Sequence, residues 1–227
     1  MPKNAGWSFR ALHGQRALWA LGLVGVLLFS LPLSAQTYGY KQAEDPLIKG
    51  VKKAIQVARE KDFDQLTSAF ESLQWQVDEL KEDIAIDMSE PLGEALKSKD
   101  IRRVTYSLTE LVFHAILQKF HWNENESLKK FVPARSRIEA AEFYYDEILS
   151  HAVRRADKSL KAQRHRTIKA EFKALKKSLG STGLFGVGKR APDLAAHQKS
   201  SKRIEKLLRE VYTDFRKRPS TDVEGGG

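Results

Sequence analysis

Two Glu-x-x-x-His pairs are the residues of this chain whose types and spacing could bind a metal ion. The pairs are Glu110 with His114 and Glu147 with His151. Residues four positions apart lie on the same face of a helix, so each pair could offer two ligands to one metal. Two such helices packed side by side would place all four side chains inside a helical bundle. The alternative is that each Glu and His lie at the helix surface and stabilise the helix.

Other cofactor chemistry has little support in the sequence. The chain contains no Cys, which excludes disulfides, Cys zinc sites and haem attached through C-x-x-C-H. Non-covalent haem between His and Met ligands is an alternative for a helical bundle, and Met88 is the only methionine besides Met1. Neither a Gly-x-Ser-x-Gly nor a His-Glu-x-x-His motif occurs. We therefore predict that the protein is not an enzyme and has no cofactor, with a metal ion or non-covalent haem as the alternative.

A strongly basic stretch is the second feature with chemical meaning. Between residues 154 and 177 there are ten basic and two acidic side chains. Such a surface attracts anionic membrane headgroups or an acidic protein partner. Aromatic residues that could stack on bases are nearly absent from it, so we do not expect specific nucleic-acid binding. The basic residues are Arg154, Arg155, Lys158, Lys161, Arg164, Arg166, Lys169, Lys173, Lys176 and Lys177.

Charge is unevenly distributed along the chain. Residues 36–100 hold 9 basic and 14 acidic side chains, a net charge of −5, whereas residues 154–227 hold 20 and 8, a net charge of +12. The basic surface could therefore bind an external partner, lie solvated, or pair with the acidic half of its own chain. The sequence does not indicate an oligomeric state.

The N-terminal 35 residues have the pattern of a secretory signal peptide. Lys3, Arg10 and Arg16 precede an uncharged apolar stretch over residues 17–33, and small residues before Gln36 suit cleavage after Ala35. An uncleaved segment that anchors the protein in the inner membrane is the alternative. An exported protein without Cys is typical of a bacterial periplasm, which is the location that we expect.

Apolar residues spaced three and four apart predict helices over residues 48–58, 63–84, 101–122 and 134–152. Asp45, Asp62, Asp100 and Asp193 each precede such a stretch and are typical helix N-caps. No alternating run of β-branched residues suggests a strand. We predict an all-α protein, an antiparallel helical bundle with a four-helix-bundle-like core and an additional basic amphipathic C-terminal helical pair.

The predicted segments follow from these signals. A signal peptide (1–35) and a linker (36–45) precede a helical bundle (46–180), whose basic part forms one amphipathic helix from Arg154 to Lys177 with Leu160 on its apolar stripe. A Gly-rich loop (181–192) leads to a C-terminal helix packed on the bundle (193–218) and a disordered tail (219–227). We expect a non-enzymatic periplasmic protein that binds a protein partner or an anionic envelope surface through its basic C-terminal helices. The alternative is a metal- or haem-binding bundle.

Overall fold

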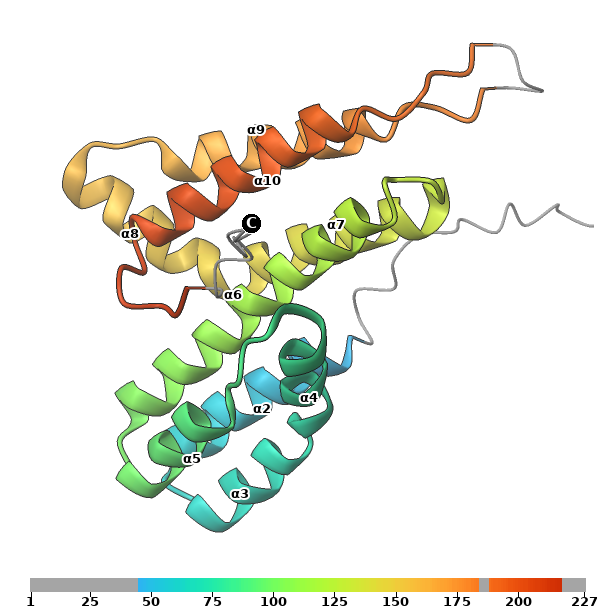
Figure 1. Ribbon diagram of the computed structural model, residues 1–227. Coiled ribbons are helices and arrows are strands. Elements are labelled where there is room, and N and C mark those ends of the chain that lie inside the picture. Colours follow the sequence, from blue (N-terminus) through green and yellow to red (C-terminus); the bar gives the residue numbers. More distant parts are fainter. Residues whose placement is uncertain (1–44, 184–187, 218–227) are drawn as a thin grey trace, which may run out of the picture. The chain divides into compact units, whose positions relative to one another are not determined.

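The computed structural model describes residues 45–183 and 188–217, of which 78% are helical (Figure 1). The predicted signal peptide and tail, and residues 36–44 of the predicted linker, lie outside the described residues. The helices are α2 (Pro46–Glu60), α3 (Phe63–Glu71), α4 (Gln74–Ile84), α5 (Ser89–Ser98), α6 (Ile101–Asn125), α7 (Phe131–Tyr144), the π-helical turn η2 (Tyr145–Leu149), α8 (Ser150–Leu160), α9 (Arg164–Ser178) and α10 (Leu194–Arg209).

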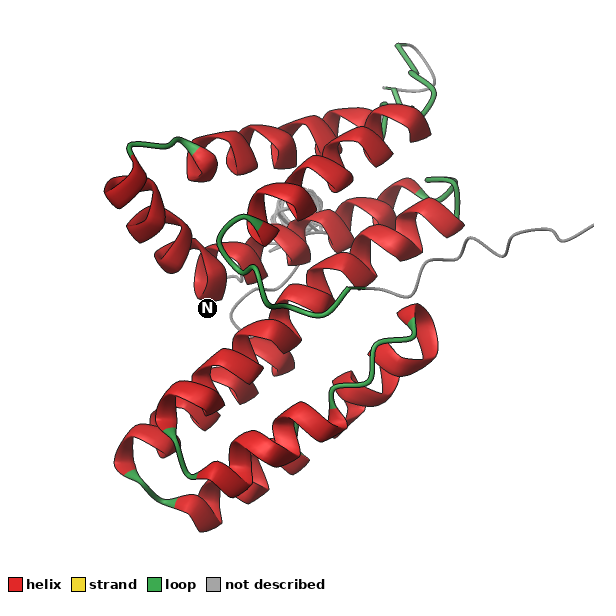
Figure 2. Ribbon diagram, turned by 60° about the vertical axis from the view of Figure 1, so that its left-hand side comes forward, coloured by secondary structure: helices red, strands yellow, loops and turns green. Residues whose placement is uncertain are grey.

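The protein is an all-α helical bundle, as predicted, in which short connections join the neighbouring helices from α2 to α9 (Figure 2). The four predicted aspartate caps are confirmed, because each side chain accepts a hydrogen bond from a backbone N–H in the first turn of its helix. In α2 the acceptor is Asp45, 2.9 Å from the nitrogen of Ile48. In the described part of the chain, no helix has the length and apolar character needed to cross a membrane.

Helix α6 is the centre of the bundle. Residues 110–118 are buried without interruption, so neighbours must enclose this part of the helix on every side. They are α2, α4 and α5 in one group and α7, η2 and α10 in another (Figure 1). The predicted apolar stripe covered only one face of this helix, whereas the structure buries all of its faces over these nine residues.

The predicted helix over residues 63–84 is interrupted. Helix α3 ends at Glu71 and α4 begins at Gln74, because the N–H of Leu73 donates to the carbonyl of Phe70, three residues earlier, at 2.9 Å. This tight turn leaves Leu73 buried. Its side chain lies against Gly50 of α2, where a Cβ atom would be 2.6 Å from Leu73 Cδ2.

A π-helical turn changes the predicted apolar stripe over residues 134–152. The N–H of Ser150 bonds to the carbonyl of Tyr145, five residues earlier, which inserts one extra residue into the helix. Leu149 and Val153 are therefore fully buried, whereas Ile148 and Ala152, which continue the predicted stripe from Tyr145 with spacings of three and four residues, are only half-buried. The prediction was wrong at these positions because it assumed an uninterrupted α-helix.

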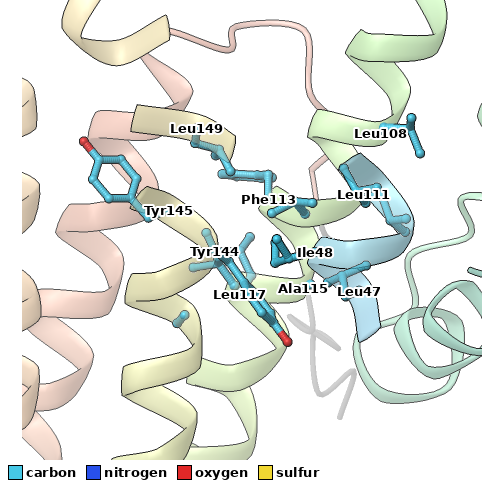
Figure 3. Packing of buried hydrophobic residues seen from close by; sticks show 14 of the residues in the cluster. Leu47, Ile48, Leu108, Leu111, Phe113, Ala115, Leu117, Tyr144, Tyr145 and Leu149 are labelled. Carbon is cyan, nitrogen blue, oxygen red and sulfur yellow. The ribbon is translucent and has the colours of Figure 1, made fainter. Parts of the chain in front are cut away.

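Tyr144 and Tyr145, at the start of this turn, project to different sides of the helix (Figure 3). The hydroxyl of Tyr144 donates to Asp45 at 2.9 Å, which joins this helix to the start of α2. Tyr145 Oη lies 2.7 Å from Nδ1 of His165, which joins the same helix to α9. Two adjacent residues thus connect elements on opposite sides of the bundle.

The basic segment is two helices rather than the predicted single one. Helix α8 ends where Lys161 adopts a left-handed conformation with φ of 51°. The carboxylate of Asp157 accepts the N–H of His165 at 2.8 Å and a guanidinium hydrogen bond from Arg164 at 3.3 Å, so it caps the start of α9. Leu160, predicted on the apolar stripe, is consequently 65% exposed.

The ends of the predicted Gly-rich loop meet. Ser181 and Arg190 exchange two backbone hydrogen bonds of 3.1 Å. Gly180 precedes this bridge with φ of 73°, and a Cβ atom there would lie 2.2 Å from the carbonyl oxygen of Arg190. Only glycine fits this position. Residues 184–187 of the loop lie outside the described residues.

The last helix is shorter than predicted, ending at Arg209 instead of extending through residue 218. The guanidinium of Arg209 donates to the carbonyls of Phe215 and Arg216 at 3.1 and 3.2 Å, which holds the chain in a turn. Phe215 is buried and stacks on Tyr212, with ring centroids 4.6 Å apart. The end of the chain therefore returns to cover α6.

His197 of α10 is a buried histidine in this core, and it makes folding sensitive to acid. Burial lowers its pKa from 6.5 to about 4. As pH falls, His197 therefore becomes protonated near pH 6.5 in the unfolded chain but only near pH 4 in the folded protein. The free energy of unfolding consequently decreases as pH falls through this window. Between about pH 7 and about pH 5 we expect the free energy of unfolding to fall by about 2 kcal/mol more in the unsubstituted protein than in His197→Gln.

Urea denaturation at several pH values measures this difference, with His197→Asn as a second uncharged variant and His151→Gln, at an exposed position, as the control. Parallel pH profiles for the unsubstituted protein and both His197 variants would contradict the prediction.

Candidate functional site

A groove of about 880 Å³ lies between α2, the N-terminal part of α6 and the helix formed by η2 and α8. Its volume is in the range of ligand sites, about 300–1,000 Å³. Tyr212, in the segment that returns after α10, completes the wall. Two of the four predicted metal-ligand residues, Glu147 and His151, line this groove, and Glu110 and His114 do not.

The floor of the groove is apolar because of the π-helical turn. The extra residue in the turn leaves Ile148 and Ala152 half-buried at the edge of the core, and both line the groove. Ile55 of α2 and Tyr106 of α6 also line the groove, and Tyr106 is 40% exposed. The π turn therefore produces an accessible apolar strip, and such turns are frequent at functional sites.

Cationic side chains also line the groove, and they are exposed and form its rim, whereas the aliphatic residues Ile55, Ile148 and Ala152 are half-buried and form its floor. Lys52 and Arg59 come from α2, Arg102 from α6 and Arg155 from α8. Glu147 is the single acidic residue among the lining residues, and it forms an ion pair with Lys52 at the surface. The groove thus combines an apolar floor with a net positive charge, an arrangement that favours an amphipathic, anionic ligand.

Glu110 and His114 have a structural role inside the bundle. Glu110 is 4% exposed, and its Oε1 accepts the N–H of Arg216 at 2.7 Å and lies 3.7 Å from His114 Nε2. Burial acts to raise the pKa of Glu110, but the interactions with His114 and the Arg216 backbone outweigh it, so its pKa lies below the usual value. The carboxylate fastens the returning C-terminal segment to α6.

The four predicted ligands therefore do not form one metal site. Glu110 is engaged by the backbone of Arg216, and Glu147 by Lys52. Across the residues that the structure describes, no three His, Cys, Asp or Glu side chains are grouped so that they could hold a metal ion. The four-residue spacing places the Glu and His of each pair on one face of a helix. It does not determine how the two helices pack, so it could not predict whether the two pairs face each other.

Three of the ten predicted cations form ion pairs within the bundle, and Arg154, although exposed, donates a hydrogen bond to His165 Nε2 at 3.3 Å. Lys169 pairs with Glu142 and with Asp146, the latter at 2.7 Å, and Lys176 also pairs with Glu142. Burial acts to raise the pKa of Glu142, but hydrogen bonds from both lysines outweigh it and lower the pKa. Arg164 pairs with Asp157 and with Glu210. These half-buried cations join α9 to α7, η2, α8 and the end of α10.

The acidic partners of these cations do not come from the acidic half of the chain, which corrects the alternative that the basic stretch pairs with that half. They lie between residues 142 and 210, not in the acidic residues 36–100. The reason is topological, since α9 packs against α7, α8 and α10. The acidic and basic ends of the sequence are not paired with each other through these residues.

The other seven predicted cations are exposed. On α9 they form one stripe, because Arg166, Lys173 and Lys177 are spaced by seven and four residues. Helix α10 packs against α9 (Figure 1). It has exposed lysines at 199, 202 and 206. We call the exposed cations of α8, α9 and α10 the basic surface; they are Arg154, Arg155, Lys158, Lys161, Arg166, Lys173, Lys177, Lys199, Lys202, Arg203 and Lys206.

Sequence reasoning missed Lys52, Arg59 and Arg102 as site residues. They lie outside the basic stretch, in α2 and α6, and are brought to the groove only by packing of those helices beside α8. Their positive charge was visible in the sequence, but the part of the chain that contains Lys52 and Arg59, residues 36–100, is acidic overall with a net charge of −5.

Removal of the Glu110 carboxylate should loosen the returning segment. We expect Glu110→Ala to lower the free energy of unfolding by about 2 kcal/mol, since it removes the hydrogen bond from the Arg216 backbone N–H to a charged acceptor, a type of bond worth about 1.5–3 kcal/mol. The matched control is Glu139→Ala in α7, which removes a partly exposed carboxylate paired with the exposed Arg135 of that helix and should cost about 0.5 kcal/mol or less. Urea denaturation gives both values, and hydrogen exchange should show faster exchange at Arg216 in Glu110→Ala alone. Equal effects of the two substitutions would contradict this role.

Comparison of the chain with protein-family models, with curated proteins and with solved structures found no match.

Proposed function

We propose that this is a non-enzymatic periplasmic protein that docks on an anionic envelope surface or an acidic protein partner through its basic surface. The observation that carries the proposal is that the ten predicted cations differ in their burial and pairing. Three are half-buried and paired with carboxylates of the bundle, whereas seven are exposed. The bundle thus holds α9 in place through some of its cations and leaves others available to a partner.

Electrostatics favours a broad anionic target over a small ligand at this surface. The exposed cations extend over α8, α9 and α10, and Arg166, Lys173 and Lys177 span three turns of α9, about 16 Å. A surface of this size adds many weak, screened attractions, each worth about 1 kcal/mol near an anionic membrane. Binding should therefore be reversible and sensitive to salt.

Export is part of the proposal and is supported by the N-terminal sequence pattern. When the full chain is expressed in a Gram-negative host, we expect the protein in the periplasmic fraction with Gln36 as its first residue. Intact-mass analysis of that fraction measures the cleavage. A protein that keeps residues 1–35 and sediments with the inner membrane would favour the uncleaved anchor instead.

Charge reversal on α9 should strongly weaken binding to anionic targets. For the secreted protein with Arg166→Glu, Lys173→Glu and Lys177→Glu, we expect about a hundredfold weaker binding to vesicles containing phosphatidylglycerol. The control reverses Lys49, Lys53 and Lys61, which are exposed residues in or next to α2, and gives the same change in net charge. Co-sedimentation with anionic and with neutral vesicles measures binding.

The acidic-partner form of the proposal is measured with immobilised polyglutamate, for which the same two triple variants should show the same contrast. The proposal is contradicted if neither probe binds, if binding does not weaken between about 50 and about 300 mM salt, or if both triple variants bind equally.

A further inference from the structure

The groove has chemistry that the basic surface lacks, namely an apolar floor within a cationic rim. The floor includes Ile148 and Ala152, which the π-helical turn directs into it. The rim cations stand on three walls, and Lys52 and Arg59 alone are separated by two turns of α2, about 10 Å. A ligand with a single anionic head would engage only part of this rim. The arrangement suits several carboxylates flanking an apolar contact, as on the face of an acidic amphipathic helix.

The chain itself presents such a face on α4. Trp75 is the most exposed tryptophan among the described residues, with 38% of its surface accessible. Asp78 and Glu82 are exposed and follow it by three and seven residues, so all three lie on the same face of the helix. The face lies within the acidic part of the sequence, residues 36–100, with its net charge of −5.

The α4 face is turned to solvent in its own molecule. Helix α4 packs on α6 through its opposite side, where Gln76, Val77 and Leu80 are buried. None of the residues that line the groove comes from α4. Charge complementarity can therefore be satisfied between two molecules, with the indole on the apolar floor and the carboxylates at the rim.

We infer that the groove between α2, α6 and α8 is the docking site for the Trp75–Glu82 face of α4 from a second copy of this chain. The two surfaces differ, so the interface is heterologous and joins copies head to tail. The site is separate from the Arg166, Lys173 and Lys177 stripe, and its occupation leaves that stripe available to an anionic target. Association depends on charge and should weaken with salt.

Sedimentation velocity of the secreted protein measures the inference directly. At about 50 mM salt we expect species larger than the monomer that grow with protein concentration and dissociate at about 300 mM salt. Two interface variants each disrupt one of the two surfaces. Arg59→Glu with Arg102→Glu disrupts the groove, and Trp75→Ala with Asp78→Asn and Glu82→Gln disrupts the α4 face. Each alone should associate at least about tenfold more weakly.

Mixing the two variants is the decisive measurement. One retains an intact α4 face and the other an intact groove, so a 1:1 mixture can form one interface and no more. We expect a heterodimer that does not grow with concentration. The matched control, Arg166→Glu with Lys173→Glu, should self-associate like the unsubstituted protein, which distinguishes failure of this inference from failure of the proposed function. Circular dichroism checks that every variant is folded.

Several results would overturn the inference: a monomer at every concentration at low salt, association unchanged in both interface variants, loss of association in the α9 control, or no heterodimer in the mixture. If the monomeric protein instead binds dodecanoate, and Arg59→Glu with Arg102→Glu abolishes that binding, the groove takes a small amphipathic anion and not a second copy.

Discussion

Enclosure of α6 is the constraint on which the rest of the structure depends. Nine successive residues of this helix, 110–118, are buried, so helices must cover it from every direction. The polar residues in this stretch need partners inside the protein, because an unsatisfied buried polar group costs about 1–3 kcal/mol. Glu110 is satisfied by the Arg216 backbone, and Gln118 donates to Asp83 at 2.6 Å. Each of these contacts fixes a distant segment of the chain against α6.

The π-helical turn allows two residues of the helix after α6 to face the core although they are not spaced for an α-helix. Tyr144 and Leu149 must both face the core, although they are five residues apart (Figure 3). One inserted residue meets this demand and leaves Ile148 and Ala152 half-buried, where they line the groove. Local accommodation of core packing thus creates the apolar floor of the groove. A feature that serves stability also determines where a partner could find an apolar contact.

Charge has two separate roles in the basic part of the chain. Lys169, Lys176 and Arg164 are half-buried and neutralise carboxylates at the junctions between helices, where desolvation strengthens each interaction. Exposed cations such as Lys173 and Lys177 gain little from the fold and remain available for long-range attraction. Composition alone treats the two sets as one basic face, but substitutions in the first set alter the bundle itself.

The sequence by itself determined the helical class, the aspartate caps and the basicity of the C-terminal third, because these depend on neighbours a few residues apart. It could not determine the break at Ser72, the break after Leu160 or the π turn, since each is decided by side chains packing across the bundle. For the same reason Glu110 and Glu147 had the right spacing for metal ligands but lie in different surroundings. The groove required tertiary structure altogether, because its cations and its apolar floor come from α2, α6 and α8 and meet only when those helices pack.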